Sequence, residues 1–110
     1  MSKSVDEMTN DELNAAIVTA LGPGNFILTV FPEFNPAEDI SHAFCLEMSG
    51  WNWTFKTNKR GLLAQARHRL TGETIETHIH WNDFVTLSEV FALARSRMWL
   101  KMWYFVADNM

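Results

Sequence analysis

Cysteine, proline and glycine are scarce in this chain, which has one, three and five of them among 110 residues. Because Cys45 is alone, no intramolecular disulfide can form, and we expect a reducing compartment. No run of about eighteen apolar residues is present to span a membrane, and residues 1–4 open no apolar signal segment. The sequence therefore predicts a cytoplasmic protein that has no membrane partner.

The sequence also lacks a motif that would hold a cofactor or a metal. Residues 22–24 read Gly-Pro-Gly but lack the Lys-Ser/Thr pair of a phosphate-binding loop. His78 and His80 are two apart on a predicted strand, a spacing that can hold a metal, and Glu76 could serve as a further ligand. Exposed histidine pairs are usually plain polar surface, however, so we expect no metal and no cofactor.

No two side chains stand out as a nucleophile and its base. His42 and Cys45 are one turn apart on a predicted helix, with Glu38 and Asp39 nearby. A nucleophilic thiol has to be exposed, and a carboxylate has to orient its base. Cys45 lies between two large apolar residues, which indicates a partly buried side chain. We therefore predict no catalytic residues and a protein that is not an enzyme.

Large apolar side chains are abundant. Apolar residues make up 47% of the chain and include eight Phe, five Trp and six Met. Because each aromatic side chain buries a large area, a chain of this length can form one stable core without a metal or disulfides. We predict a single domain over residues 1–110, in which residues 1–8 are frayed.

Alternating residues predict a three-stranded antiparallel sheet between Trp51 and Trp81. In residues 51–56 an aromatic side chain alternates with a polar one, which is the period of a strand with one buried face. Residues 58–61 form a turn, and a second strand runs from Leu62 to Leu70. If Thr71-Gly72 is the hairpin loop, a third strand follows over residues 73–81.

This hairpin register places Arg67 opposite Glu76, as a cross-strand ion pair, and Leu63 opposite His80. One face of the hairpin is then apolar and consists of Leu62, Ala64, Ala66, Leu70, Ile75, Ile79 and Trp81. The other face is polar and consists of Gln65, Arg67, Arg69, Thr74, Glu76, His78 and His80. We therefore expect helices on one side of this sheet.

Capping patterns predict three helices. Thr9 and Glu12 form a capping box that opens the first, Asn35 caps the second, and Thr86 opens the third, which runs to about Val106. The apolar stripes include Ile40, Ala43, Phe44 and Met48 in the second helix and Leu87, Val90, Phe91, Ala94 and Met98 in the third. Residues 26–31 are apolar and indicate a short extended segment or a fourth edge strand.

The predicted fold class is α+β: a three-stranded antiparallel sheet, with or without a fourth edge segment, packed with two or three helices. The end of the last helix differs from the rest because it is apolar nearly all round, which indicates burial on every side or contact with another molecule. Burial under residues 26–31 is one interpretation. The other is an association surface, since aromatic side chains are enriched at interface cores, formed by Trp99, Leu100, Trp103 and Tyr104.

Charge is divided unevenly along the chain, whose net charge is −4. Residues 1–50 contain eight acidic residues and one lysine, whereas residues 51–70 contain five basic residues and no acid. Such an asymmetry usually reflects solvated faces, but it also suits a nucleic-acid backbone. The residues of this alternative polar surface are Lys56, Lys59, Arg60, Arg67 and Arg69.

The order of segments resembles a known family. A helix opened by residues 11–14, a second opened by residues 35–40, a Trp-bearing strand with a hairpin, and a last helix opened by Thr86-Leu87 are similar to the small phage proteins called the phage ABA sandwich domain. The resemblance covers most of residues 9–103, implies a bacteriophage or prophage origin, and supplies no catalytic residues. A sandwiched sheet should be apolar on both faces, however, and one predicted face here is polar.

A double-stranded RNA binding domain has a similar order of elements over residues 36–106. That fold grips phosphates with lysines at the start of its last helix, where this chain has Leu87-Ser88-Glu89. We therefore predict a non-enzymatic, phage-encoded interaction protein that binds and inhibits a host protein or complex, such as a host-defence system, in the manner of an anti-CRISPR. Self-association as a homodimer is a further expectation. The alternatives are a nucleic-acid or nucleotide binder that uses the basic hairpin and, less favoured, a small enzyme.

Overall fold

The computed structural model describes residues 4–81 and 86–108 and shows an α+β fold, as predicted. A 3-10 turn, η1 (Val5–Glu7), comes first, followed by the helices α1 (Asn10–Leu21), α2 (Phe26–Val30) and α3 (Ile40–Ala43). The strands β1 (Trp51–Thr57), β2 (Gly61–His68) and β3 (Thr74–His80) form an antiparallel sheet in the order β1-β2-β3. The chain then continues into a long helix, α4 (Leu87–Asp108).

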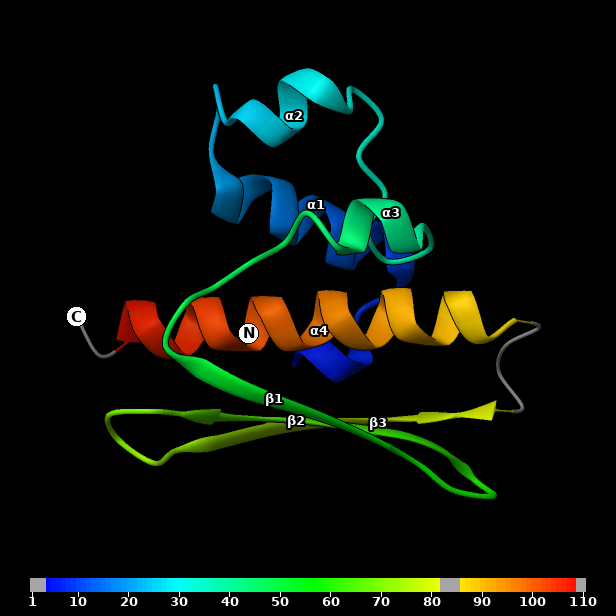
Figure 1. The fold of residues 1–110 in the computed structure, drawn as a ribbon. Coiled ribbons are helices and arrows are strands. Elements are labelled where there is room, and N and C mark those ends of the chain that lie inside the picture. Colours follow the sequence, from blue (N-terminus) through cyan, green and yellow to red (C-terminus); the bar gives the residue numbers. More distant parts are fainter. Residues whose placement is uncertain (1–3, 82–85, 109–110) are drawn as a thin grey trace.

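The elements form stacked layers with α4 in the middle (Figure 1). One side of α4 packs on β2 and β3, and its other side packs on α1 and α3, while α2 lies outermost. Among the described residues, no helix lies on the opposite face of the sheet. The predicted placement of helices on one side of the sheet is confirmed for these residues, and the central position of α4 explains why the end of this helix is apolar nearly all round.

The predicted alternation of buried and exposed side chains is confirmed in all three strands. In β1, Trp51 is 4% exposed, and in β2 Ala64 and Ala66 are buried beside Leu62, while the intervening polar residues face outward. The inward aromatic and aliphatic side chains pack against residues of α4 and form the core. Leu70 is the exception, since its side chain is 91% exposed and the prediction that it lies on the apolar face is wrong.

The predicted hairpin register is wrong by two residues. The His68 N–H donates to the Glu73 carbonyl (2.8 Å), so the loop contains four residues, 69–72, and not two. Gly72, whose φ is +77°, closes this loop with its N–H on the His68 carbonyl (2.9 Å). A longer loop shifts the pairing without changing which residues face the core, because the shift is an even number of residues.

The new register removes the predicted ion pair between Arg67 and Glu76. Arg67 lies opposite Thr74, and Glu76 lies opposite Gln65, whose Nε2 donates to Glu76 Oε2 (3.1 Å). Leu63 lies opposite His78 and not His80. The polar face of the hairpin is therefore held by a neutral-to-charged hydrogen bond in place of an arginine–carboxylate pair.

Two segments between α1 and the sheet differ from their predictions. Residues 26–30 are helical, not extended, because the Asn25 side chain accepts from the Ile27 N–H (2.9 Å) and caps a short turn. The next helix begins at Ile40 and not at Pro36, since Asp39 is its cap and accepts from the N–H groups of Ser41 (2.9 Å) and His42 (3.4 Å). The sheet therefore has no fourth edge strand within the described residues.

The remaining helix predictions are partly confirmed. Both halves of the capping box between Thr9 and Glu12 are present, and the Glu89 N–H donates to Thr86 Oγ1 (3.2 Å) at the start of α4. The helix after Asp39 ends at Ala43, so Phe44 is 60% exposed and does not belong to a buried stripe. Leu87 is likewise 58% exposed, which makes its predicted place in the core wrong.

The N-terminal turn is bonded to the sheet and to α4. The prediction that residues 1–8 are frayed is therefore wrong for residues 4–8. Residues 1–3 lie outside the described residues. Val5 is buried in the core at 6% exposure. The Asp6 carboxylate accepts from Thr77 Oγ1 on β3 and from Lys101 Nζ on α4, both at 2.7 Å. These bonds join three elements that are far apart in the sequence.

The Asp6 contacts predict a pH-dependent contribution to stability. Burial raises the pKa of Asp6, but hydrogen bonds from Lys101 and Thr77, with the charges of Lys101 and Arg97, outweigh it and hold the pKa below its ordinary value. The contribution is therefore present above the unfolded pKa of about 4 and is lost as the pH falls through the folded pKa. Because the Asp6 side chain is 46% exposed, we expect less than about 1 kcal/mol.

Urea unfolding of Asp6→Asn and the parent protein at pH 7 and at pH 3 measures this contribution. The destabilisation caused by the substitution is expected at pH 7 and should shrink toward zero at pH 3. Glu7→Gln, a change at the neighbouring exposed residue, is the matched control. An Asp6→Asn effect of the same size at both pH values would show that the ionic bonds of this residue do not stabilise the fold.

Candidate functional site

A shallow, uncharged groove lies between α1 and the C-terminal half of α4. Its volume is about 250 Å³, and it is lined by Ala15, Ala16, Thr19, Ala20, Trp103 and Tyr104. Small side chains on α1 form one wall, and two aromatic rings on α4 form the other. Such a groove can accept an apolar side chain from another molecule, because nothing charged in the lining would have to be desolvated.

The two aromatic residues of the groove are held in fixed relation to each other. The rings of Trp103 and Tyr104 meet edge to face, with 5.6 Å between centroids and 73° between planes. Tyr104 is 38% exposed and Trp103 is half-buried. Aromatic anchors of this kind, with part of the ring accessible, are the residues that most often dominate binding energy at protein interfaces.

The other two residues of the predicted aromatic surface lie in the core. Trp99 is 4% exposed and donates from its indole Nε1 to the Glu47 carbonyl (3.1 Å), and Leu100 is fully buried. The interpretation that Trp99 and Leu100 belong to an association surface is therefore wrong, because α1 and the α3 region cover α4 on the side opposite the sheet (Figure 1). The cover is not α2, the segment proposed from the sequence. Only Trp103 and Tyr104 remain available for contact.

The five basic residues predicted as a polar surface are all exposed, but the fold separates them. Lys59 and Arg60 lie in the turn between β1 and β2, whereas Arg67 and Arg69 lie at the other end of β2. Lys56 lies opposite Leu63, near the first of these two groups. The Arg69 Nε donates to Asn52 Oδ1 (3.0 Å), which holds this guanidinium against the sheet. The structure therefore does not gather the five into one patch.

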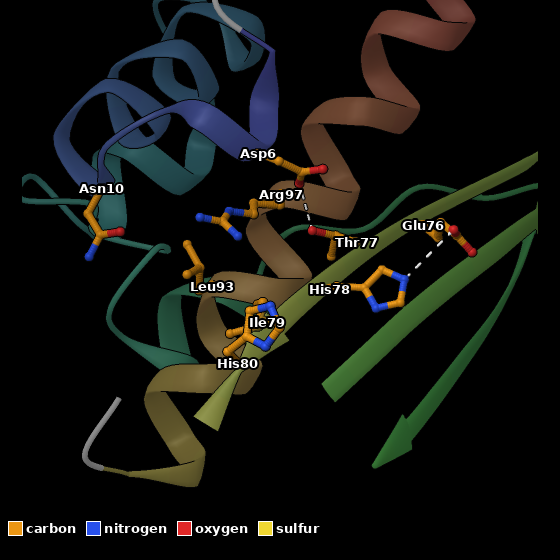
Figure 2. Close-up of a pocket in the computed structure, with 9 residues that line it drawn as sticks. All are labelled: Asp6, Asn10, Glu76, Thr77, His78, Ile79, His80, Leu93 and Arg97. Atoms are coloured by element: carbon orange, nitrogen blue, oxygen red, sulfur yellow. Dashed lines mark hydrogen bonds and ion pairs between the residues drawn. The ribbon is translucent and has the colours of Figure 1, made fainter. Parts of the chain in front are cut away.

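A wider cleft of about 780 Å³ lies between the outer edge of β3, the N-terminal turn and α4 (Figure 2). His78 and His80 lie at its border, and the His78 Nε2 is 3.8 Å from Glu76 Oε1, with both side chains more than half exposed. Across residues 4–81 and 86–108, no three His, Cys, Asp or Glu side chains come together as metal ligands would. Charges of both signs line the cleft, and Asp6 is already bonded to Thr77 and Lys101.

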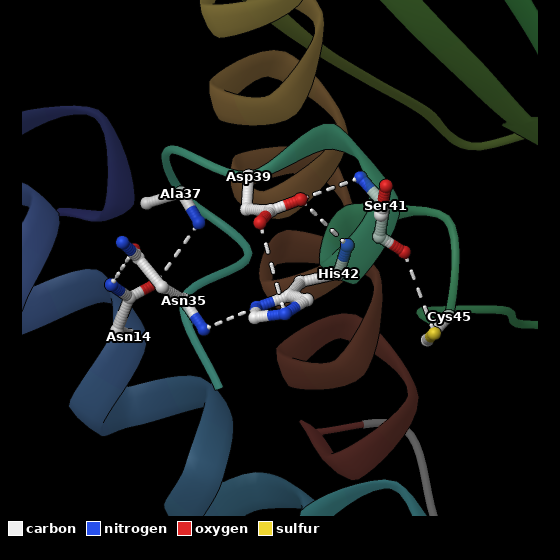
Figure 3. Close-up of polar contacts among 7 residues, drawn as sticks. All are labelled: Asn14, Asn35, Ala37, Asp39, Ser41, His42 and Cys45. Carbon is white, nitrogen blue, oxygen red and sulfur yellow. Dashed lines mark hydrogen bonds and ion pairs between the residues drawn. The ribbon is translucent and has the colours of Figure 1, made fainter. Parts of the chain in front are cut away.

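His42 and Cys45 are not paired with each other (Figure 3). The Cys45 thiol points to the Ser41 carbonyl (3.5 Å). The His42 Nδ1 accepts from the Asn35 N–H (2.9 Å), which places the remaining ring proton on Nε2 in the neutral imidazole, 3.8 Å from Asp39 Oδ2. The imidazole and the thiol therefore each have another partner and are not hydrogen-bonded to each other.

The His42 ring belongs to a network that fixes the long segment between α2 and α3 on α1 (Figure 3). It packs against the rings of both Phe31 and Phe34, with centroid distances of 4.5 and 5.4 Å. Asn35, which does not cap a helix, accepts from Asn14 Nδ2 (2.6 Å). The Asn14 Oδ1 in turn accepts from the Ala37 N–H (3.0 Å). These contacts satisfy backbone groups of an irregular segment and describe a structural role.

A second surface, at the β1 edge of the sheet, escaped the sequence prediction. The guanidinium of Arg95 lies between the rings of Phe44 and Trp53, 5.2 and 5.1 Å from their centroids. It donates to the carbonyls of Ala43 (3.0 Å) and Leu46 (3.1 Å). Burial lowers the pKa of Arg95, and the charge of Glu47 opposes this change. No local sequence pattern indicates these contacts, because Arg95 is some fifty residues away from its partners.

The aromatic row at this edge continues along β1. Trp53 stacks on Phe55 with 5.9 Å between centroids, and Phe55 meets Phe91 of α4 at 5.6 Å. Trp53 and Phe55 are half-buried, and Phe44 is 60% exposed. We call Phe44, Trp53, Phe55 and Phe91 the aromatic edge.

Comparisons with known proteins give no assignment: no family model, no curated protein and no solved structure matches this chain. Within the part of the chain that the structure describes, no helix combines the length and hydrophobicity needed to cross a bilayer. The fold and surfaces thus define the class of molecule, an α+β domain with two partly exposed aromatic surfaces.

Proposed function

We propose that this protein is a non-enzymatic interaction protein and that the groove between α1 and α4 binds an apolar segment of a partner protein. The observation that carries this proposal is the uncharged lining of the groove, with Trp103 and Tyr104 opposite small residues of α1. A side chain inserted there would bury apolar area on both sides. Contacts within the chain do not bury the aromatic wall completely, since the Tyr104 side chain remains 38% exposed.

The resemblance to small phage proteins supports a host protein as the partner. In that setting the protein acts by occupying a surface of a host system, such as a defence complex, in the manner of an anti-CRISPR. Binding in place of chemistry agrees with the arrangement of His42 and Cys45, which are each hydrogen-bonded to another group and not to each other. We do not assign a role in nucleic-acid binding to the basic residues, because they lie in two groups at opposite ends of β2.

Two substitutions in the groove test this proposal. Trp103→Ala removes one of the two rings of the aromatic wall, and we expect partner affinity to fall by about 2 kcal/mol or more, as it does for interface tryptophans. Thr19→Lys places a charge in the groove from an exposed position and should weaken binding with little change in monomer stability. Capture from a host lysate, followed by titration of the captured protein with each variant, measures both effects.

The matched control is Thr29→Lys, which adds the same charge at an exposed position of α2 that is not part of the groove. This variant should capture the partner as the parent protein does. Equal capture by all variants would overturn the assignment of the groove. Loss of capture only after the paired changes Arg67→Glu and Arg69→Glu would place the contact on the sheet and favour a nucleic-acid or polar partner.

A further inference from the structure

The hydrogen-bonding pattern of the sheet shows which backbone groups point out from its two edges. The Arg69 N–H donates to the Gly50 carbonyl (2.9 Å), and the Asn58 N–H donates to the Gly61 carbonyl (3.0 Å). These bonds mark both ends of the β1–β2 ladder, and in an antiparallel pair the residues that bond to the neighbouring strand alternate with residues that point away. The even-numbered residues of β1 therefore bond to β2, and Trp51, Trp53, Phe55 and Thr57 direct their backbone groups outward.

The opposite edge, β3, is obstructed. By the same alternation, Glu76 directs its carbonyl outward, and Lys101 Nζ donates to it (2.6 Å) while also binding Asp6 (2.7 Å). A charged side chain on an outward carbonyl, with η1 beside it, blocks the approach of another strand. Within residues 4–81 and 86–108, no hydrogen bond of this kind covers the outward groups of Trp53 and Phe55. The two edges of the sheet are thus unequal.

We propose that β1 pairs with β1 of a second copy of this chain, antiparallel, about a twofold axis that passes through Thr54. In this register Trp53 lies opposite Phe55 of the other copy, and their outward N–H and C=O groups bond to each other. Thr54 lies opposite Thr54 of the other copy in a non-hydrogen-bonded pair, and both side chains are on the polar face of the sheet. The result is a continuous six-stranded sheet.

The side chains of β1 suit pairing with themselves. On the core side, the register brings half-buried aromatic rings together, and cross-strand aromatic pairs are favourable. On the polar side, Lys56 lies opposite Asn52 of the other copy, so the single charge of the strand never meets its equivalent. A twofold axis through Lys56 would instead place two like charges face to face, which is unfavourable.

Closure of the assembly favours a second copy over an unrelated strand. A twofold interface uses the same edge on both chains and leaves the two β3 strands as the outer edges of the joined sheet. Both outer edges then carry the Lys101 obstruction, so the sheet cannot grow further. This inference stands apart from the proposed function, because the aromatic edge and the groove between α1 and α4 share no residue.

Disulfide trapping tests the proposed register. In a Cys45→Ser background, which removes the one natural thiol, Thr54→Cys should form an intermolecular disulfide under mild oxidation. Residues in a non-hydrogen-bonded antiparallel pair have Cα atoms about 4.5 Å apart, within the range of a disulfide. Asn52→Cys is the control, because residue 52 lies on the same face of the strand as residue 54 but two residues from the axis. Its Cα would therefore be roughly 13 Å from the Cα of residue 52 in the other copy.

The expected result is a cross-linked dimer for Thr54→Cys and little for Asn52→Cys, with a dimer of the uncross-linked parent protein in sedimentation velocity. Amide exchange of Trp53 and Phe55 should also slow by roughly tenfold or more from dilute to concentrated protein, because these N–H groups bond only in the dimer. A monomeric parent protein, or equal cross-linking of the two cysteine variants, would overturn the proposal and leave the β1 edge open to a strand from another protein.

Discussion

Replacing Trp99 by alanine is expected to cost about 3–5 kcal/mol of the free energy of unfolding, the range for a buried tryptophan. The side chain is 4% exposed, and its indole N–H donates to the Glu47 carbonyl in the segment between α3 and β1. Truncation would leave a cavity among the helical layers and remove the part-buried hydrogen bond to the Glu47 carbonyl. For a 110-residue domain, a loss of this size removes a large share of the total stability.

Urea unfolding at pH 7 measures this loss, and two further variants separate its causes. Trp99→Phe keeps much of the volume but removes the N–H, so its cost should be nearer the roughly 0.5–1.5 kcal/mol of one ordinary hydrogen bond. Trp103→Ala, at a half-buried position one turn later, should cost less than Trp99→Ala. If Trp103→Ala proves the more destabilising of the two, Trp103 and not Trp99 is the core residue, and the groove loses its accessible wall.

The second large effect is expected at Gly61, the first residue of β2. A Cβ built at this position would overlap the Ile79 carbonyl oxygen of β3. The carbonyl oxygen is a backbone atom, and the Cβ would be fixed directly to the backbone of the paired strand, in which Gly61 lies opposite His80, so the overlap cannot be relieved without separating the strands. We expect Gly61→Ala to cost about 3 kcal/mol, at the upper end of the usual range for overpacking. Gly61→Val should cost more.

Gly24→Ala provides the matched control, because it separates a steric overlap from backbone strain. A Cβ at Gly24 meets no atom within 4 Å, but its φ of +83° is one that only glycine adopts freely. The expected cost is therefore about 1–2 kcal/mol, from strain alone. Thermal or urea unfolding compares the two variants. A Gly61→Ala protein as stable as Gly24→Ala, with the β2–β3 amides still protected, would show that the ladder can widen at low cost.

Much of the fold could be predicted from short stretches of sequence. The alternation in residues 51–56 indicates β1, because in a strand with one buried face residues two apart lie on the same face and share the same polarity. The cap at Thr9 and the cap at Thr86 are local as well, since each depends on a side chain and a backbone N–H three residues later. The same locality explains the failure at Asn35, whose side chain is used by Asn14 of α1 and so does not cap a helix.

The candidate site could be predicted only in part. The sequence singled out the aromatic end of α4, and two of the four residues, Trp103 and Tyr104, do line a groove. It could not show which side of this helix is covered, because an all-round apolar helix has no stripe that marks its buried face. The residues of the opposite wall, such as Ala16 and Thr19 on α1, are small and common residue types that no sequence motif singles out. They belong to the groove only because of their position in the fold.

The local elements, the alternation of the sheet and the division of charge follow from the sequence alone, because each depends on neighbouring residues or on counting. The pairing of Gln65 with Glu76, the burial of Trp99 and the difference between the two edges of the sheet arise only in the folded chain. These depend on contacts between distant segments: a loop two residues longer shifts a register, and Lys101, 25 residues beyond Glu76, obstructs one edge, while no such bond covers the other edge among the described residues. Such contacts are fixed by the packing of the whole chain around α4, which no window of sequence contains.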